Sequence, residues 1–229
     1  MVRELSLPFY LDGRNVYRAS VLDGLVWLEH GFGTRLSPDW LAGREVASVR
    51  QIHSDVVIQS DGRDGPAGEA DALIANRPGL VAIRTADCIP ILMADPVKRA
   101  VAAVHAGWRG TVSGIAVKSV KRMQQVFETN PNDLLAVIGP GIGSCCFEVG
   151  PEVAIRFQSL LPERADLKKR TRIDLAEVNR RQLIGIGLSS ARISTFEICT
   201  CCGGELWHSY RRDRETAGRM STAIGILAK

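Results

Sequence analysis

Cys88 and His105 lie on two apolar runs that the sequence predicts to pair as a β-hairpin. Residues 89–94 and 100–105 flank an Asp-Pro-Val-Lys turn, and a four-residue loop built on a type I turn suits Pro96 at its second position. In that register Ala94 pairs with Arg99, and Cys88 lies directly opposite His105. Directly opposed Cβ atoms are roughly 4.5–5.5 Å apart. That separation suits two ligands of one metal ion, or a Cys–His catalytic pair.

His53 is the third candidate, since it lies inside a strand pattern over residues 46–58. His53, Cys88 and His105 together would supply three ligands and leave a fourth position open, as in catalytic zinc sites. The same side chains allow two other interpretations. Cys88 could be a thiolate nucleophile with a histidine base, or the set could be a blue-copper site with Met93 as its weak ligand. Met93 has the opposite strand parity to Cys88, so it should point to the other face.

A helical pattern follows His105, with Thr111 as its N-cap and Asn130-Pro131 as its end. The free N–H groups and dipole of a helix N-terminus favour anions, and Arg109 adds a guanidinium that can bind an anion through two hydrogen bonds. We expect a phosphate or carboxylate there, next to a metal at His105. The alternative is that Arg109 simply points to solvent.

The remaining cysteines give weaker signals. Cys145 and Cys146 follow a Gly-rich turn at 139–143 that lacks the Lys and Ser/Thr of a P-loop, and buried, inert thiols are the default expectation for them. The cysteines at 199, 201 and 202 could bind a second metal, but the sequence has no partner C-x-x-C for them. Such spacings make a poor disulfide framework, so we expect a reducing, cytoplasmic location with thiols free or metal-bound.

Composition is that of an ordinary globular protein of 229 residues, with 45% apolar residues and a formal net charge of +4. A charge this small favours a solvated surface over nucleic-acid binding. No window has about 18 uninterrupted apolar residues, so we expect no membrane-spanning helix. The first ten residues lack the pattern of a secretory signal.

Strand patterns at 72–75, 80–85, 134–138, 191–198 and 220–227 alternate with helical ones that begin at Thr111, Pro151 and Asp174. Asp174 and Glu177 form a capping box. The sequence has no repeat and no linker long enough to divide the chain. It therefore predicts one mixed α+β domain over residues 1–229.

Motifs spread over almost the whole chain resemble those of the YfiH proteins, also called the laccase-domain or multicopper polyphenol oxidoreductase family. T-A-D-C at 85–88 followed by H-A-G-W-R-G at 105–110 is the most specific pair. The others are H-G-F-G-T-R (30–35), Q-I-H-S-D (51–55), D-A-L (71–73), G-P-G-I-G-S-C-C-F-E-V (139–149), D-L with R-x-Q-L (174–183), C-T (199–200), and S-Y-R-R-D with T-A-G-R (209–219).

The resemblance implies a layered α/β/β/α sandwich, a fold shared with glutamine-deamidating bacterial toxins. It implies zinc held by His53, Cys88 and His105, and an enzyme that cleaves adenosine, inosine and methylthioadenosine with phosphate and also deaminates adenosine. We assign substrate contacts to Arg35, Gln51 and Arg109. Purine nucleoside and phosphate are then the small-molecule partners, with no nucleic acid or membrane.

Two other activities are associated with the same resemblance. One is a Cys/His or zinc amide hydrolase that edits peptidoglycan precursors, and the other is a copper polyphenol oxidoreductase. This chain has only four histidines, too few for the blue-copper site and trinuclear cluster of a laccase. It also departs from the family pattern between Arg35 and Gln51, where the segment is shorter than usual, and this makes substrate preference the least secure inference.

Overall fold

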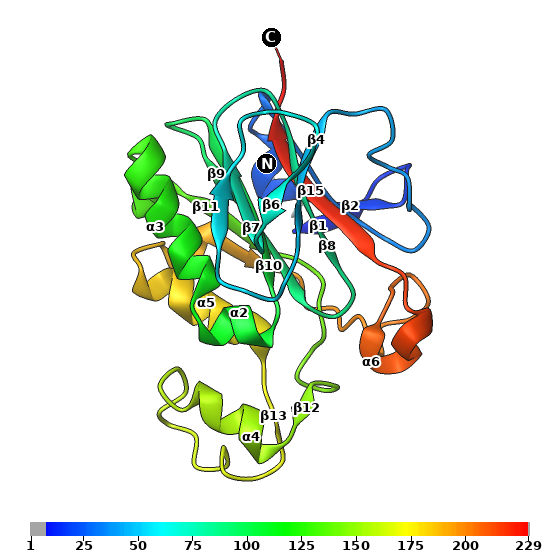
Figure 1. The fold of residues 1–229 in the computed structure, drawn as a ribbon, viewed down its shortest axis with the longest axis vertical. Helices are drawn as coiled ribbons and strands as arrows, with labels where there is room; N and C mark the ends of the chain where they lie inside the picture. Colours follow the sequence, from blue (N-terminus) through cyan, green and yellow to red (C-terminus); the bar gives the residue numbers. More distant parts are fainter. Residues whose placement is uncertain (1–7, 229) are drawn as a thin grey trace, which may run out of the picture.

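Two β-sheets packed face to face form the body of the computed structural model, which describes residues 8–228 (Figure 1). The seven-stranded sheet has the order β1 (Phe9–Leu11), β2 (Val16–Ala19), β3 (Leu28–Gly33), β15 (Met220–Ile226), β8 (Gly79–Thr85), β4 (Val46–Arg50) and β6 (Gly65–Glu69). The six-stranded sheet has the order β14 (Ile193–Thr195), β11 (Leu135–Ile138), β9 (Ile89–Asp95), β10 (Ala100–Ala106), β7 (Ala72–Ala75) and β5 (Val57–Gln59).

Helices cover the outer face of the six-stranded sheet (Figure 1). They are α2 (Trp108–Val112), α3 (Ile115–Phe127) and α5 (Leu175–Gly185). Three further short helices are α1 (Ser20–Asp23), α4 (Pro151–Ala154) and α6 (Tyr210–Asp213), and β12 (Glu148–Val149) pairs with β13 (Thr171–Arg172) beside α4. On the outer face of the seven-stranded sheet, Trp40 from a segment of turns packs on Val16, Ala82 and Ala223. The predicted mixed α+β, layered fold is confirmed.

Strand β9 shows why the two sheets form a sandwich. Ile91 and Met93 pack against the helices, whereas Leu92 and Ala94 pack against the seven-stranded sheet. Since successive side chains on a strand point to opposite faces, a strand that is apolar at every position must be covered on both sides. Burying each such large side chain stabilises the fold by about 1.5–3 kcal/mol. Met93 faces the helices, as its parity predicted.

The hairpin of β9 and β10 turns where expected, but its register differs from the prediction. Asp95 pairs with Ala100, so His105 lies opposite Pro90 rather than Cys88. Residues 96–99 form the loop, and Arg99 has a left-handed φ of 48°. Asp95 accepts hydrogen bonds from the backbone N–H groups of Val97 and Lys98 at 2.9 Å each, which keeps Asp95 as the last paired residue. The prediction placed this boundary one residue too early on each strand.

Pro90 lies on an internal strand, not on the edge or bulge that its missing N–H would suggest. Its carbonyl accepts from the backbone N–H of Gly139 at 2.8 Å, so its backbone faces β11. The β11 ladder ends there, at Ile138. The N–H that proline lacks would point to the same side as its carbonyl, toward β11. Pro90 therefore removes no hydrogen bond from the pairing of β9 with β10.

Two further expectations are corrected. The helix after His105 begins at Trp108 and is divided by Gly114, whose φ of 75° interrupts the helical turn between α2 and α3. Thr111 is therefore no N-cap; it is buried and accepts a hydrogen bond from Asn179 at 3.0 Å. The strand expected over residues 46–58 is two strands, β4 and β5, which belong to different sheets.

The third predicted helix is confirmed. The side chain of Asp174 accepts a hydrogen bond from the backbone N–H of Glu177 at 2.9 Å, and α5 begins at the next residue after Asp174. No helix among residues 8–228 is both long enough and apolar enough to cross a bilayer.

Candidate metal and active site

His53, Cys88 and His105 come together at one end of the sandwich. His105 lies on β10, Cys88 directly precedes β9, and His53 lies on the crossing between β4 and β5. One ligand atom from each residue lies within 4.8 Å of the other two. The two imidazole rings are 5.0 Å apart and nearly perpendicular. Cys88 has the same strand parity as Pro90, the partner of His105, so the two side chains are diagonal neighbours on one face.

Asp71 lies directly behind His105. Its Oδ1 is 2.7 Å from His105 Nδ1, and the backbone N–H of His105 donates to the Asp71 carbonyl at 2.7 Å. Both side chains are buried. Because Nδ1 of His105 is hydrogen-bonded to the carboxylate, its Nε2 remains available to face Cys88 and a bound metal ion.

The same carboxylate also positions His53. Asp71 accepts hydrogen bonds from the backbone N–H groups of Ile52, His53 and Ser54 at 3.3, 3.0 and 2.5 Å, and from the Ser54 hydroxyl at 2.7 Å. His53 has a left-handed φ of 58°, which these contacts hold in place. One buried carboxylate thus fixes two of the three candidate ligands.

Asp71 was not among the predicted site residues, although it lies in the D-A-L motif at 71–73. The available signal was a charged residue immediately before β7, whose four residues are all buried. An acidic residue at the end of a fully buried strand requires partners.

The charges at the site favour a thiolate beside an imidazolium when no metal is bound. Burial raises the pKa of the Cys88 thiol, but hydrogen bonds with His105 and His53 outweigh it and lower the pKa to about 6. Burial lowers the pKa of His105, but hydrogen bonds with Asp71 and Cys88 outweigh it and raise the pKa to about 9. Burial likewise raises the pKa of Asp71, and its bonds with His105 and Ser54 lower it to about 2.

Metal-free protein should therefore carry a reactive Cys88 thiolate at neutral pH. We expect the rate of Cys88 alkylation by iodoacetamide to rise with pH through a midpoint of about 6, because the reactive thiolate forms as pH passes the thiol pKa. Replacing His105 by Gln removes its positive charge and should move the midpoint upward. Mass spectrometry of the Cys88 peptide measures both. A midpoint near that of an ordinary thiol in the unmodified chain would contradict the proposed pairing.

The three side chains fit a metal ion. Two imidazoles and a thiol are the donors that zinc and copper prefer, and the thiol loses its proton easily at this position. The Asp71–His105 contact is the carboxylate–histidine arrangement common behind metal ligands. Of the other two histidines, His30 accepts a hydrogen bond from the backbone N–H of Ala19 at 2.8 Å, and His208 lies beside Arg35. Neither belongs to this set.

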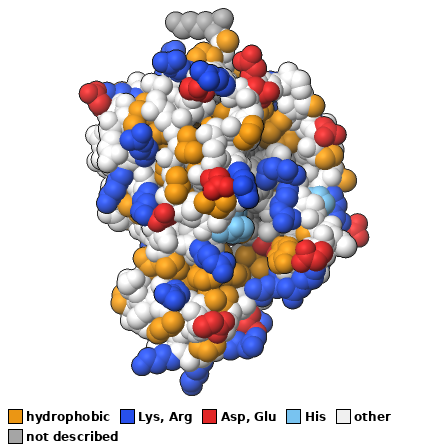
Figure 2. Space-filling model, in the orientation of Figure 1, with side chains coloured by type: hydrophobic (Ala, Val, Ile, Leu, Met, Phe, Trp, Pro, Cys, Tyr) orange, Lys and Arg blue, Asp and Glu red, His pale blue; other side chains and the backbone are white. Residues whose placement is uncertain are grey.

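The three candidate ligands line a cavity of about 640 Å³. Figure 2 shows a hollow on this face where histidine reaches the surface, with basic side chains on either side and apolar side chains below. The cavity walls combine flat or apolar side chains with guanidinium groups. They are formed by Trp108, Phe147, Tyr210, Ile142, Leu175, Arg84, Arg109, Arg211 and Arg219, together with Val49, Gln51, Ala86 and Asp87.

The structure brings some of the predicted substrate contacts to this cavity and not others. Arg109 lines it, with its guanidinium 4.4 Å from the centre of the Trp108 ring. Gln51 also lines it, but its amide accepts from the backbone N–H of Arg84 at 2.7 Å and donates to the Arg84 carbonyl at 2.8 Å. Arg35 is not part of this lining; it forms an ion pair of 3.2 Å with Asp213.

The Asp87 carboxylate joins two loop segments to the site. It accepts hydrogen bonds from Thr200 Oγ1 at 2.7 Å, from Ser209 Oγ at 3.1 Å and from the backbone N–H of Arg211 at 2.6 Å. These bonds attach the segments around Thr200 and Arg211 to the residue next to Cys88. Arg211 and Arg219, from the 209–219 motifs whose charge cluster could bind an anionic substrate, also reach the cavity wall. Arg84 was not predicted as a wall residue, because only the fold brings it to the cavity.

Comparison with known proteins supports the resemblance. Residues 35–227 match the family described as multi-copper polyphenol oxidoreductase laccase. A purine nucleoside phosphorylase of Clostridium acetobutylicum is 36% identical over 189 residues, covering 81% of this chain and 79% of that protein. The purine nucleoside phosphorylase YlmD of Geobacillus stearothermophilus is 40% identical over 205 residues, covering 82% and 75%.

The fold is likewise shared. The crystal structure of a Bacillus licheniformis protein named YfiH superposes with a TM-score of 0.86 at 29% identity, covering 96% of this chain and 100% of that one. The chain therefore belongs to the multi-copper polyphenol oxidoreductase laccase family, in which its relatives carry the names YfiH and YlmD.

Proposed function

We propose that this protein is a purine nucleoside phosphorylase that holds zinc at His53, Cys88 and His105. The observation that carries the proposal is the cavity: the three ligands face a space of about 640 Å³ whose walls pair aromatic side chains with guanidinium groups. The names of the relatives agree with it, because two of them are purine nucleoside phosphorylases.

The apolar side of the cavity suits the purine and the ribose. Trp108, Phe147 and Tyr210 offer flat surfaces, and Ile142 and Leu175 complete an apolar wall. A purine ring stacks well on aromatic faces, and polar groups at the rim fix its orientation. The volume lies within the range of small-molecule sites, roughly 300–1,000 Å³.

The basic side of the cavity suits phosphate. Among the described residues, the Arg109 guanidinium has no hydrogen-bond or ion-pair partner and only stacks on Trp108, so its donors are available. A stacked guanidinium is held in one plane and can bind a phosphate through two parallel hydrogen bonds. Helix α2 is too short to add a binding site at its N-terminus, so phosphate binding depends on Arg109 itself.

Phosphorolysis needs phosphate and nucleoside held in line. A phosphate oxygen bonds to C1′ of the ribose as the bond from C1′ to the base nitrogen breaks, and the electron pair leaves with the base. Arg109 orients the phosphate, the aromatic walls hold the purine, and Asp71 keeps His105 in the orientation that the ligand set requires. Zinc bound at the three ligands would supply stabilisation of negative charge and activation of water.

Adenosine deamination is the second activity in the proposal. It uses the same purine-binding wall, but water replaces phosphate as the reactant. The test is the product profile from adenosine, with and without phosphate. We expect adenine and ribose 1-phosphate only when phosphate is present, and inosine in both cases. Absence of ribose 1-phosphate from every purine nucleoside would overturn the phosphorylase proposal.

A second function is favoured by one specific observation. Asp71, His105 and Cys88 lie in the order of an orienting acid, a base and a nucleophile, and Cys88 has a lowered pKa. This order would serve a thiolate amide hydrolase acting on cell-wall precursors. Metal analysis distinguishes the two functions, because a bound zinc occupies the thiolate and blocks its alkylation. Protein that is active, metal-free and inactivated by iodoacetamide at Cys88 would favour the hydrolase.

A further inference from the structure

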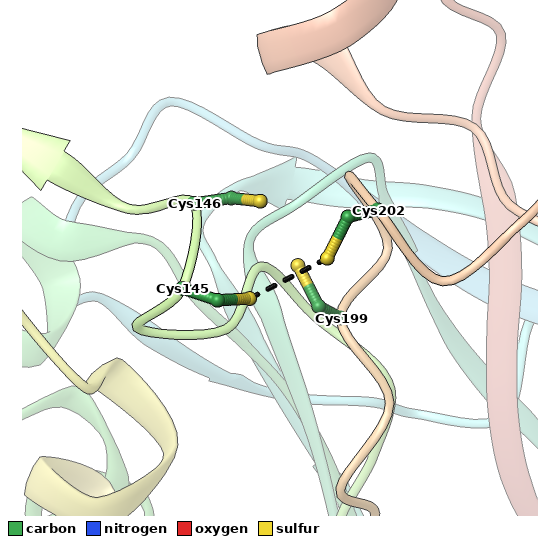
Figure 3. A group of neighbouring side chains, drawn as sticks. All are labelled: Cys145, Cys146, Cys199 and Cys202. Carbon is green, nitrogen blue, oxygen red and sulfur yellow. Dashed lines mark hydrogen bonds between the residues drawn. The ribbon is translucent and has the colours of Figure 1, made fainter.

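Four cysteines from two distant parts of the chain point their sulfur atoms toward one another (Figure 3). Cys145 and Cys146 follow the Gly-rich turn after β11, and Cys199 and Cys202 follow β14. All four sulfur atoms lie within 4.8 Å of one another, and those of Cys145 and Cys202 are 3.5 Å apart. The partner for the 199–202 segment, which the sequence analysis did not find, is therefore the adjacent pair at 145–146.

We propose that Cys145, Cys146, Cys199 and Cys202 form a second metal site that binds one zinc ion through four thiolates. A zinc–sulfur bond of about 2.3 Å in tetrahedral geometry places the sulfur atoms roughly 3.8 Å apart. The observed cluster needs only small side-chain movements to reach that spacing. Clusters of several iron atoms hold their ligands farther apart, so the spacing favours a single ion.

The backbone around Cys199 has the form that metal-binding turns use. Cys199 and Cys202 have the C-x-x-C spacing of structural zinc sites. The backbone N–H of Gly203 donates to the Cys199 carbonyl at 2.7 Å and closes the turn. The backbone N–H groups of Cys202, Gly143 and Cys201 point at the Cys199 sulfur. Such N–H donors stabilise a metal-bound thiolate.

The two segments approach each other closely at Gly143. A Cβ atom on Gly143 would lie 3.1 Å from Cys199 Cβ and 3.3 Å from Cys145 Sγ. The backbone N–H of Thr200 donates to the Gly141 carbonyl at 2.9 Å, which holds the segments side by side. Cys145 and Cys202 are exposed and Cys199 is buried, so an ion can enter from solvent and be enclosed on one side.

Nearby positive charge suits such a site. Four thiolates around one zinc carry a net charge of −2. Arg212 donates to the carbonyls of Thr200 and Cys201 at 3.2 and 3.1 Å, and Arg211 donates to the Cys146 carbonyl at 2.9 Å. Both guanidinium groups therefore lie on the backbone of the two metal-binding segments.

A metal ion at this second site would stabilise the wall of the cavity at His53, Cys88 and His105. Ile142 and Phe147 of the first segment line that cavity, as does Arg211, while Thr200 of the second segment donates to Asp87 beside Cys88. We therefore assign this second zinc a structural role. It links two loops whose positions determine the shape of the substrate pocket.

Metal content tests the proposal in protein produced with zinc in the medium. We expect two zinc ions per chain in the unmodified protein, and one in the Cys145→Ser/Cys202→Ser double variant and in His105→Ala. Cys201→Ser is the matched control, because Cys201 is adjacent in sequence but outside the cluster; it should retain two. One zinc in the unmodified chain with no loss in the double variant would overturn the proposal.

A second measurement needs no substitution and therefore does not depend on the folding of a variant. After removal of metal under reducing conditions, iodoacetamide should label Cys145 and Cys202, and prior addition of zinc should protect both. Equal labelling with and without zinc would contradict the site. A Cys145–Cys202 disulfide that persists in zinc-loaded protein would also contradict it, and would assign the cluster to redox chemistry.

Discussion

Alanine at His53, Cys88 or His105 is expected to remove one zinc ion per chain and to abolish phosphorolysis. Each substitution leaves two ligands at a site that supplies three, and catalytic zinc sites use three protein ligands. Metal analysis of each purified variant, with ribose 1-phosphate release as the activity readout, measures both effects. His208→Ala is the matched control, because His208 lies beside Arg35 and outside the ligand set. Full zinc content in Cys88→Ala would show that the thiol is not a ligand.

Asp71→Asn should give a graded form of the same defect. Asparagine keeps the size of the side chain but loses a carboxylate oxygen that accepts from the segment carrying His53. Loss of a hydrogen-bonded partner behind a ligand typically costs about 10–100-fold in metal affinity. A zinc competition titration measures the change. An unchanged zinc affinity would mean that the two histidines are positioned without Asp71.

Arg109→Ala is expected to impair phosphorolysis far more than adenosine deamination. Loss of one charge-assisted contact of about 1.5–3 kcal/mol should raise the phosphate KM or lower kcat by at least roughly tenfold. Deamination brings no phosphate, so inosine formation in the same preparation should fall less. Arg109→Lys keeps the charge but loses the planar fork, and should recover only part of the activity.

The matched control for this prediction is Arg122→Ala, since Arg122 is exposed on α3 and outside the cavity. It should leave both activities unchanged. Equal losses of phosphorolysis and deamination in Arg109→Ala would show that Arg109 supports the structure or contacts the nucleoside instead of phosphate.

The sequence predicted correctly that His53, Cys88 and His105 come together, even though two of its structural arguments were wrong. The alternation of side chains along the paired strands places Cys88 and His105 on one face of the sheet. The observed register differs from the predicted one by one residue on each strand, and this difference leaves both side chains on the same face. The shift itself depends on the hydrogen bonds of the Asp95 side chain with the loop. Residue types at the turn do not specify those bonds uniquely.

His53 shows what local patterns could not reveal. Apolar alternation over residues 46–58 resembles one strand, but the chain leaves one sheet after Arg50 and joins the other at Val57. Between the two strands, the backbone N–H groups of His53 and Ser54 donate to the Asp71 carboxylate. Contacts between residues far apart in sequence decide such a crossing, and periodicity does not report them.

The helix after His105 illustrates the same limit on a smaller scale. The helical pattern itself was predicted correctly, and Ala116, Val120, Met123 and Phe127 of α3 are buried. The start of the helix was predicted wrongly. A glycine inside a helical pattern usually only weakens the helix, and the sequence does not indicate that Gly114 interrupts it. Phosphate binding is therefore expected to depend on the position of Arg109 in the cavity, and not on a helix dipole.

The most direct test of the account is whether phosphorolysis follows zinc occupancy of the His53–Cys88–His105 site. Metal-free protein is titrated with zinc, and ribose 1-phosphate release from inosine is measured alongside protection of Cys88 from iodoacetamide. Protection of Cys88 reports this site alone, whatever the four-cysteine cluster binds. We predict that activity rises in proportion to Cys88 protection and is absent without zinc. Phosphorolysis in metal-free protein, or full protection of Cys88 with no phosphorolysis, would contradict the account.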